Sequence, residues 1–274
     1  MRNTLSALAL SLLLGACAPY VQTTSGSQYL GNYSQDPAVI AAMDPQVRAA
    51  AEVEPVLTFP ARLGLARIAN GQISPIPADE AKLWTDFAAA NADLGEFVPI
   101  SPLLAAFAAA DTKSAAPNVT ITNCFTYNCG QNPTELAQAI RIGAARQHVD
   151  AVLIYAVGAD GSNELNPLAL GDITLIGLAV LPGRDLEARG LAQAILIDVR
   201  NGYPYGTASA VADRSRIHPN LGSDAKLEAM RQDVAAEAVE RLIPEVQAMV
   251  TELKAGLAAK TVTQPGATKQ AAAN

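Results

Sequence analysis

ILIDVRNGYPYGTAS (195–209) places Asn201-Gly202 between two runs of strand-forming residues. Asn-Gly is the pair most typical of two-residue type I′ turns, because both central residues of that turn have φ > 0. The stretch therefore predicts a β-hairpin, with one strand over 188–200 and its partner over 203–212.

A helix and a buried strand are predicted upstream of the hairpin. NPTE (132–135) is a helix start, with Asn as the cap, Pro at the first helical position and Glu able to reach back to the cap N–H. The helix is expected to end at about His148, whose charge suits a helix C-terminus. VDAVLIYAVG (149–158) follows directly, and a continuous apolar run of this kind predicts a strand buried on both faces.

The remaining periodicity completes a mixed sheet flanked by helices. The other expected strands are 62–68, 96–101 and 172–182, and the other expected helices are 78–91, 102–111 and one or two short helices over 36–53, started by Asp36-Pro37 and Asp44-Pro45. A long helix from Ser223 to Leu257 has an apolar residue every three or four positions, and Pro244 is expected to kink or split it. The fold class is therefore α/β (α+β), with a mixed, mainly antiparallel sheet flanked by helices and a long C-terminal helix.

A short apolar run at the N-terminus ends in LLLGAC (12–17) and follows Arg2. It is typical of an export signal and too short to cross a bilayer, which needs about 20 residues. LGAC (14–17) matches the bacterial lipobox, which predicts cleavage after residue 16 and acylation of Cys17, with palmitate among the chains. The alternative is an ordinary signal peptide cut near residue 16 or 18, which would leave Cys17 as a free thiol.

Acylation of Cys17 would place the protein on a membrane, because two or more acyl chains anchor a protein stably. Ala18 rather than an aspartate follows the cysteine, which favours the periplasmic face of the outer membrane over the inner membrane. The expected organisation is a signal peptide (1–16), a lipidated N-terminus and flexible tether (17–36), a single α/β periplasmic domain (37–258) and a disordered tail (259–274).

Two further cysteines, Cys124 and Cys129, lie in NCFTYNCG (123–130). With Cys17 acylated they form an even pair in an oxidising compartment, which predicts a structural disulfide. Their C-x₄-C spacing gives little support to a redox role. The loop carries Phe125 and Tyr127, which either pack inward or, on an outward-facing rigid loop, contact a partner.

The charge balance and the motifs exclude several function classes. The chain has 26 acidic and 19 basic residues, for a net charge of −7, and it lacks the basic block typical of nucleic-acid binding. It contains no P-loop, Rossmann fingerprint or zinc-type Cys/His cluster. We therefore expect no nucleic-acid partner, no cofactor and no metal.

Candidate catalytic residues near the end of the predicted sheet receive little support. Asp213, Ser215 and His218 are close in sequence, but triad members come from separate elements, and a G-x-S-x-G elbow is missing. Arg214, Arg216 and His218 are instead expected to form a small basic edge that could contact a partner's carboxylate or a phosphate.

Two shorter patterns have simple structural explanations. Ser223 and Lys226 fit S-x-x-K, but the companion K-T-G is absent, and Ser223 is expected to cap the last helix. Asp160, Ser162 and Glu164 alternate in a glycine-containing segment that could bind calcium but does not fit an EF-hand. A hydrated turn is the preferred interpretation there.

AARQHVDAVLIYAVG (144–158) followed by ILIDVRNGYPYGTAS (195–209) resembles the periplasmic lipoprotein domain of curli-secretion lipoproteins and of penicillin-binding-protein activator lipoproteins. That domain is also similar to the N-terminal domain of TolB. The resemblance covers roughly residues 60–257 and implies a mixed α/β domain that acts through protein contacts. The connection 158–172 looks too short and irregular for the long hairpins of the pore-forming members, so no pore is expected.

The expected function is that of a membrane-anchored accessory, assembly or regulatory factor, which binds an unidentified envelope protein or further copies of itself. No catalytic residue is assigned. Two alternatives stay open, a cell-envelope hydrolase or other enzyme and a purely structural envelope tether.

Overall fold

The computed structural model describes residues 19–34, 36–114, 133–165 and 182–263. In these ranges seven strands form one sheet, in the order β1-β7-β6-β5-β2-β3, with β4 also paired to β2. The strands are β1 (Tyr20–Val21), β2 (Ala61–Ala69), β3 (Gln72–Ser74), β4 (Gly95–Pro99), β5 (Ala151–Leu165), β6 (Pro182–Asp198) and β7 (Pro204–Pro219). The strand β2 runs parallel to β4 and β5, and the other pairs are antiparallel. The predicted mixed, mainly antiparallel sheet is confirmed.

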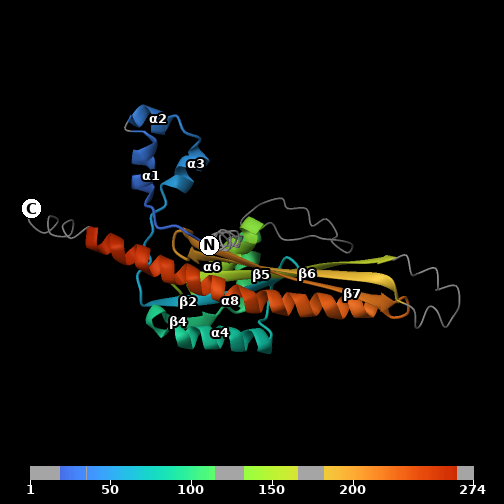
Figure 1. Cartoon of the computed structure of the whole chain (residues 1–274). Helices are drawn as coiled ribbons and strands as arrows, with labels where there is room; N and C mark the ends of the chain where they lie inside the picture. The colour runs from blue at the N-terminus through green and yellow to red at the C-terminus, as the bar shows by residue number, and fades with distance from the viewer. Residues whose placement is uncertain (1–18, 35, 115–132, 166–181, 264–274) are drawn as a thin grey trace, which may run out of the picture.

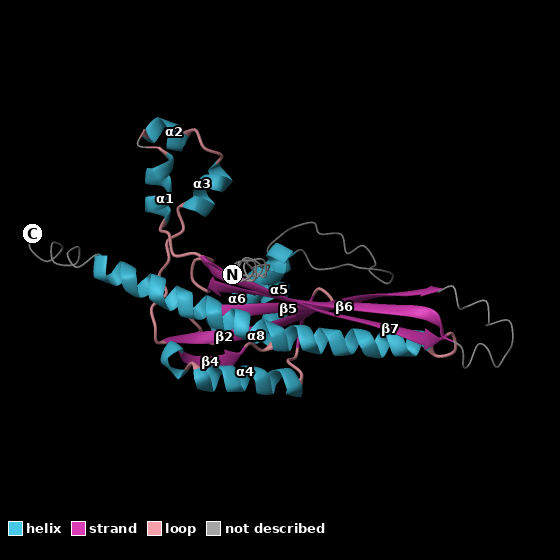
Figure 2. Ribbon diagram, viewed as in Figure 1, coloured by secondary structure: helices cyan, strands magenta, loops and turns pink. Residues whose placement is uncertain are grey.

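Helices cover both faces of the sheet (Figures 1 and 2). The helices of the described residues are α1 (Gly26–Tyr33), α2 (Pro37–Ala41), α3 (Pro45–Ala51), α4 (Ala78–Ala90), α5 (Pro102–Ser114), α6 (Pro133–Arg146) and α8 (Ser223–Thr263), with a 3-10 turn at Ala92–Leu94. Of these, α1, α2 and α3 stand away from the sheet (Figure 1). The helices α8 and α4 contribute to one apolar cluster with the sheet, and α6 contributes to a second cluster with other residues of β2 and β5. The two clusters lie on opposite faces, because neighbouring residues of a strand point to opposite sides.

The long helix α8 packs closely on the sheet because small residues lie beneath it. Its apolar stripe is buried, including Val234, Leu242, Val246, Met249 and Leu253. The facing positions of β6 and β7 are mostly alanine, and they are Ala188, Ala192, Ala194, Ala208, Ala210 and Ala212. At Gly190 a Cβ atom would lie 2.1 Å from the carbonyl oxygen of Val234, so only glycine permits this approach.

The helix α8 continues through Pro244 as one element. Of the two predicted effects of Pro244, a kink or a split, the split is therefore wrong. Proline removes one backbone N–H, and Pro244 lies on the exposed side of the helix, where water can satisfy the carbonyl that loses its partner. The buried residues on either side hold the helix to the sheet. It extends to Thr263, beyond the predicted domain end at 258.

The hairpin predicted from Asn201-Gly202 is present, but its two-residue type I′ turn is wrong. Five residues, 199–203, connect β6 to β7, and the Gly202 N–H donates to the carbonyl of Asp198 at 3.0 Å. Gly202 has φ +79°, while Asn201 is not among the described residues with positive φ. The Asp198 side chain accepts the Arg200 N–H at 2.9 Å, which starts the turn earlier than the Asn-Gly pair alone suggests.

The strand β5 extends to Leu165, where the sequence predicted an irregular connection beginning at residue 158. Pairing with β6 continues to Leu165 opposite Arg184, so the partner strand satisfies the backbone of this polar segment. The β5–β6 pair is therefore a long hairpin, contrary to expectation. Most of the predicted strand 172–182 lies outside the described residues.

The segment expected to be a flexible tether, 17–36, contains β1 and α1. The Gln22 N–H donates to the carbonyl of Tyr205 at 2.8 Å, and the Tyr203 hydroxyl donates to the carbonyl of Thr24 at 2.6 Å. Ser25 caps α1 through the Gln28 N–H. Tertiary contacts fix this segment, which is why its sequence shows no period.

The caps predicted further along the chain are confirmed. Asp36 and Asp44 accept backbone N–H groups at the starts of α2 and α3, where Pro37 and Pro45 occupy the first turn. His148 follows the end of α6 with φ +56°, and the Val149 N–H bonds the carbonyl of Ala144. The predicted helix end near His148 is therefore confirmed.

Candidate binding surface on the distal sheet and the outer edge of β7

The hairpin β6–β7 has two different ends. The turn end is where residues 199–203 join the strands, and the distal half comprises residues 158–165 of β5, 184–191 of β6 and 211–219 of β7. Their polar side chains are arranged differently, and this contrast locates the candidate binding surface.

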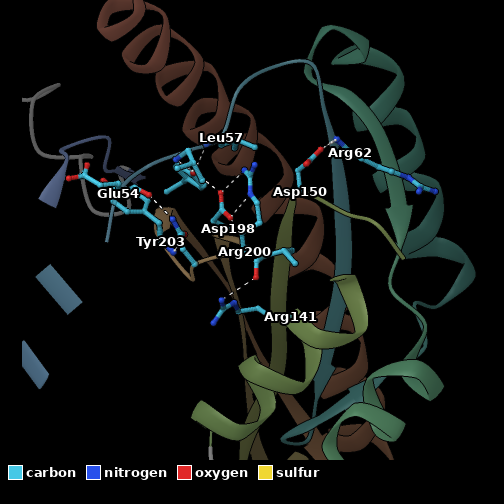
Figure 3. A network of polar contacts seen from close by, with 12 residues as sticks. Glu54, Leu57, Arg62, Arg141, Asp150, Asp198, Arg200 and Tyr203 are labelled. Atoms are coloured by element: carbon cyan, nitrogen blue, oxygen red, sulfur yellow. Dashed lines mark hydrogen bonds and ion pairs between the residues drawn. The ribbon is translucent and has the colours of Figure 1, made fainter. Parts of the chain in front are cut away.

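At the turn end a buried carboxylate organises a polar network (Figure 3). Asp198 is fully buried and accepts from the Tyr205 hydroxyl at 2.9 Å. The Arg200 guanidinium donates to both carboxylate oxygens, at 3.1 and 3.0 Å. Arg141 donates to the carbonyl of Val199 at 3.1 Å. Charge-assisted, bidentate bonds of this kind fix geometry, so the network defines the shape of the turn.

The same network holds the segment that precedes β2. The Tyr205 hydroxyl accepts the N–H groups of Val56 and Leu57 at 3.1 and 2.7 Å, and Asn201 donates to the carbonyl of Glu54 at 2.7 Å. Burial, with the neighbouring Asp198 carboxylate, raises the pKa of Tyr205 well above the usual tyrosine value. These groups are all bonded to one another, so we assign them a structural role.

A second buried polar cluster lies between α4 and the sheet. Glu80 is 5% exposed, and Arg67 donates to both of its oxygens at 2.8 and 2.9 Å. The Tyr155 hydroxyl donates to Glu80 at 2.6 Å, and burial raises the pKa of Tyr155 far above its usual value. Sequence reasoning missed this cluster, although Arg67 inside an otherwise apolar strand was a signal for a buried partner.

The distal half has one covered and one open face in the described part of the chain. On the face opposite α8, the cluster under α6 takes no residue of β5 beyond Ile154, and a Cβ at Gly158 would meet nothing within 4 Å. A shallow hollow of about 640 Å³ lies there, lined mainly by Asp160, Ser162, Glu187, Arg189, Asp213 and Ser215.

The calcium candidates Asp160, Ser162 and Glu164 lie on β5 rather than in the predicted hydrated turn. They alternate with other residues, so all three face the same side of the sheet. In the described ranges no group of three or more His, Cys, Asp or Glu residues is arranged to hold a metal ion. Two of them, Asp160 and Ser162, line the hollow.

The triad candidates Asp213, Ser215 and His218 all belong to β7. His218 follows Asp213 by five positions of extended strand, or about 17 Å, and this odd number of positions places the two side chains on opposite faces. Asp213 pairs instead with Arg189 at 3.5 Å. The structure therefore does not bring these three residues together.

The predicted basic edge is partly neutralised. Arg214 donates to Asp233 at 2.8 Å and to Glu237 at 3.1 Å, both on α8. Arg216 and His218 share the strand face of Arg214, with Arg216 exposed and His218 half-buried.

Ser223 is the first residue of α8 rather than its cap. Its hydroxyl accepts from Asn163 of β5 at 3.1 Å, and within the described part of the chain no hydrogen bond joins it to Lys226. This arrangement ties the start of α8 to the sheet and gives Ser223 no base.

Among the described residues, the outer edge of β7 is open over most of its length. In these ranges Tyr20 and Val21 of β1 pair with it, at Thr207 and Gly206, and the Gln22 N–H donates to the carbonyl of Tyr205. Backbone groups alternate between the two sides of a strand, so those of Ser209, Val211, Asp213, Ser215 and Ile217 point away from β6. Among the described residues a single partner reaches this row, Arg241, which donates to the carbonyl of Val211 at 2.8 Å.

Several predicted site residues lie outside the described ranges. They are the acylation candidate Cys17, the disulfide pair Cys124 and Cys129, and the aromatic residues Phe125 and Tyr127. In the part of the chain that is described, no helix has the length and hydropathy needed to cross a membrane.

No family model matches the chain, and no curated protein does. Among solved structures, it is similar to the LpoB C-terminal domain from Salmonella enterica, at 14% identity over 58% of this chain and 86% of that one, with a TM-score of 0.27. Lipoprotein GNA1162 from Neisseria meningitidis is 16% identical over 64% and 98%, with a TM-score of 0.27. A minor lipoprotein from Acinetobacter baumannii is 9% identical over 72% and 96%, with a TM-score of 0.30.

Bacterial lipoproteins are thus among the solved structures to which the chain is similar. Membership of the curli-secretion or synthase-activator families stays a prediction.

Proposed function

We propose that the protein is a lipid-anchored periplasmic binding factor that holds an extended segment of a partner protein along the outer edge of β7. The observation that carries this proposal is the row of outward backbone groups from Ser209 to Ile217. An extended peptide can add a strand to such an edge, and main-chain hydrogen bonds then supply the affinity.

Side chains beside the edge would select the partner. Residues 213–217 are all exposed and carry charges of both signs on the two faces of β7. Opposite charges across a strand pair stabilise it and like charges destabilise it, so the preferred segment has complementary charges. The same charged residues hinder unselective pairing, which explains how an open edge is tolerated.

The anchor is the predicted acyl group on Cys17, and we place the protein on the periplasmic face of the outer membrane. A partner would then be captured close to that membrane. We further propose that the disulfide Cys124–Cys129 presents Phe125 and Tyr127 as a second contact. The competing occupant of the outer edge of β7 is a second copy of the chain, paired through its own β7 edge.

A catalytic function has less support. Among the described residues no hydrogen bond joins the hydroxyl of Ser215 or of Ser223 to a histidine or a carboxylate. The buried carboxylates Asp198 and Glu80 are fully bonded to structural partners.

The edge can be tested with one substitution and a matched control. Ser215→Pro removes an outward N–H while leaving the bonds to β6, and proline is tolerated on edge strands. We expect Ser215→Pro to lose the proteins that co-purify with the full-length chain from envelope extracts, and Ser215→Ala to keep them. Unchanged co-purification in Ser215→Pro would contradict strand addition. If the wild-type protein forms a dimer at high concentration and Ser215→Pro does not, a second copy of the chain is the occupant of the edge.

A further inference from the structure

Residues 26–51 form a small N-terminal lobe of three helices, α1, α2 and α3, that stands away from the sheet (Figure 1). Twelve large hydrophobic side chains are exposed in the described part of the chain, and six of them lie between residues 20 and 56. They are Tyr20, Tyr29, Tyr33, Val39, Val47 and Val56. The lobe and its base therefore carry a disproportionate share of the exposed apolar surface.

This apolar surface is not needed to build the lobe. Within it only Gly26 and Leu30 are buried on α1, and neither α2 nor α3 has a buried residue. Polar contacts also hold the lobe, among them the Ser27 N–H bonded to Glu54 at 2.9 Å. Tyr29 and Tyr33 are 48% and 59% exposed, and their i, i+4 spacing places them on the same side of α1.

The start of β1 lies very close to the predicted acylation site. Two residues lie between Cys17 and Tyr20, and the three Cα-to-Cα steps that join them span only about 10 Å in a fully extended chain. Because β1 is hydrogen-bonded to β7, the acyl chains cannot hang on a long tether. With Cys17 acylated, β1 would lie within about 10 Å of the headgroups, and the lobe begins at Gly26, five positions after the end of β1.

We propose that the N-terminal lobe rests on the lipid surface, with Tyr29 and Tyr33 in the headgroup region; this inference depends on the acylation of Cys17 in the proposed function. Tyrosine suits this region because its ring is apolar and its hydroxyl is polar. The charges of the lobe are few, Asp36, Asp44 and Arg48, and the two aspartates cap helices. The lobe thus has no basic patch, and the surface that fits it is a zwitterionic phospholipid layer.

The lobe adds a weak second contact to a strong anchor. Few apolar side chains take part, so the lobe alone would not bind a membrane, but the acyl chains raise its effective concentration at the surface. The two contacts together would fix the orientation of the domain on the membrane. One end of the sheet would face the membrane, and the β7 edge would lie at a fixed distance from it.

The test compares amide hydrogen exchange of the full-length acylated protein in phosphatidylcholine vesicles and in detergent. We expect vesicles to slow exchange of residues 26–33 by about threefold or more, since binding to the folded lobe suppresses its opening. The variant Tyr29→Ser/Tyr33→Ser should lose this slowing. The matched control Leu103→Ser/Phe107→Ser removes two side chains that are 63% and 54% exposed on α5 and should retain it.

Equal exchange in vesicles and detergent, with the acyl group confirmed by mass, overturns the lobe inference and leaves the anchor intact. An unacylated mature protein that leaves the membrane fraction overturns the inference and the proposed anchor together. Slowing that persists in Tyr29→Ser/Tyr33→Ser also overturns it.

Discussion

Two aspartates of the same hairpin show how its ends differ. Asp198, at the turn end, is fully buried and bonded to Arg200 and Tyr205. Asp213, in the distal half, is 67% exposed and forms a 3.5 Å ion pair with Arg189. The Asp198 carboxylate is fully used in structural hydrogen bonds, whereas the Asp213 carboxylate is accessible to a partner. Residues for stability and residues for binding thus lie at opposite ends of one strand pair.

Removal of the buried Asp198 carboxylate should have the largest effect on stability. Asp198→Ala should lower the free energy of unfolding by about 3–5 kcal/mol, because it leaves the polar groups around the turn without their acceptor. Chemical denaturation monitored by circular dichroism measures this. Asp213→Ala is the matched control and should cost at most about 1 kcal/mol, as expected for an exposed pair; equal losses would contradict the distinction.

The buried polar cluster of Glu80, Arg67 and Tyr155 should also contribute to stability, as the network at the turn end does. Tyr155→Phe removes the hydroxyl bonded to Glu80 and should cost about 1–3 kcal/mol, measured by the same denaturation curves. A change below a few tenths of a kcal/mol would show that the hydroxyl is not buried against the carboxylate.

The pKa values of Tyr155 and Tyr205 are raised in the folded protein, which predicts alkaline destabilisation. The folded state keeps these protons when the unfolded chain loses them near pH 10, so the free energy of unfolding is unaffected below that pH and falls as pH rises above it. The fall should be shallower in Tyr155→Phe. A wild-type protein whose stability is flat between pH 9 and 11 would contradict this.

Arg214 belongs to the distal half and should matter little for stability. Its bonds to Asp233 and Glu237 are solvent-exposed, so Arg214→Ala should change the free energy of unfolding by about 1 kcal/mol or less. The loss should shrink further at high salt, because salt screens exposed charges. A loss of more than about 2 kcal/mol in the free energy of unfolding would show that Arg214 is as important for stability as the buried polar residues, and would contradict this prediction.

The distal half was also the part that sequence reasoning predicted least well. Apolar periodicity located α8 and the hairpin, because those patterns depend on which residues face the core. The polar continuation of β5 has no such pattern, and only pairing with β6 keeps it extended. Asp198 lies inside a strand-forming run, and its burial follows from side chains such as Tyr205 that meet it only in the folded chain.

The structure of the N-terminal segment was predicted wrongly for a similar reason. Its residues have no period, and β1 is held by two residues of β7 and by a tyrosine from the turn. The aspartate caps at Asp36 and Asp44 were predictable, because capping depends on neighbours in sequence. Acylation of Cys17 stays a prediction made from local sequence alone, whereas the edge of β7 required the strand order.

The central claim, that the outer edge of β7 is open for a partner strand, can be measured by residue-resolved amide hydrogen exchange on the full chain. We expect an alternation, with fast exchange at Asp213, Ser215 and Ile217 and slow exchange at Arg214 and Arg216, which bond to β6. A bound partner strand should then slow exchange at the first three residues. Uniform protection of all five amides in the free protein would show that the edge is already covered and would exclude strand addition there.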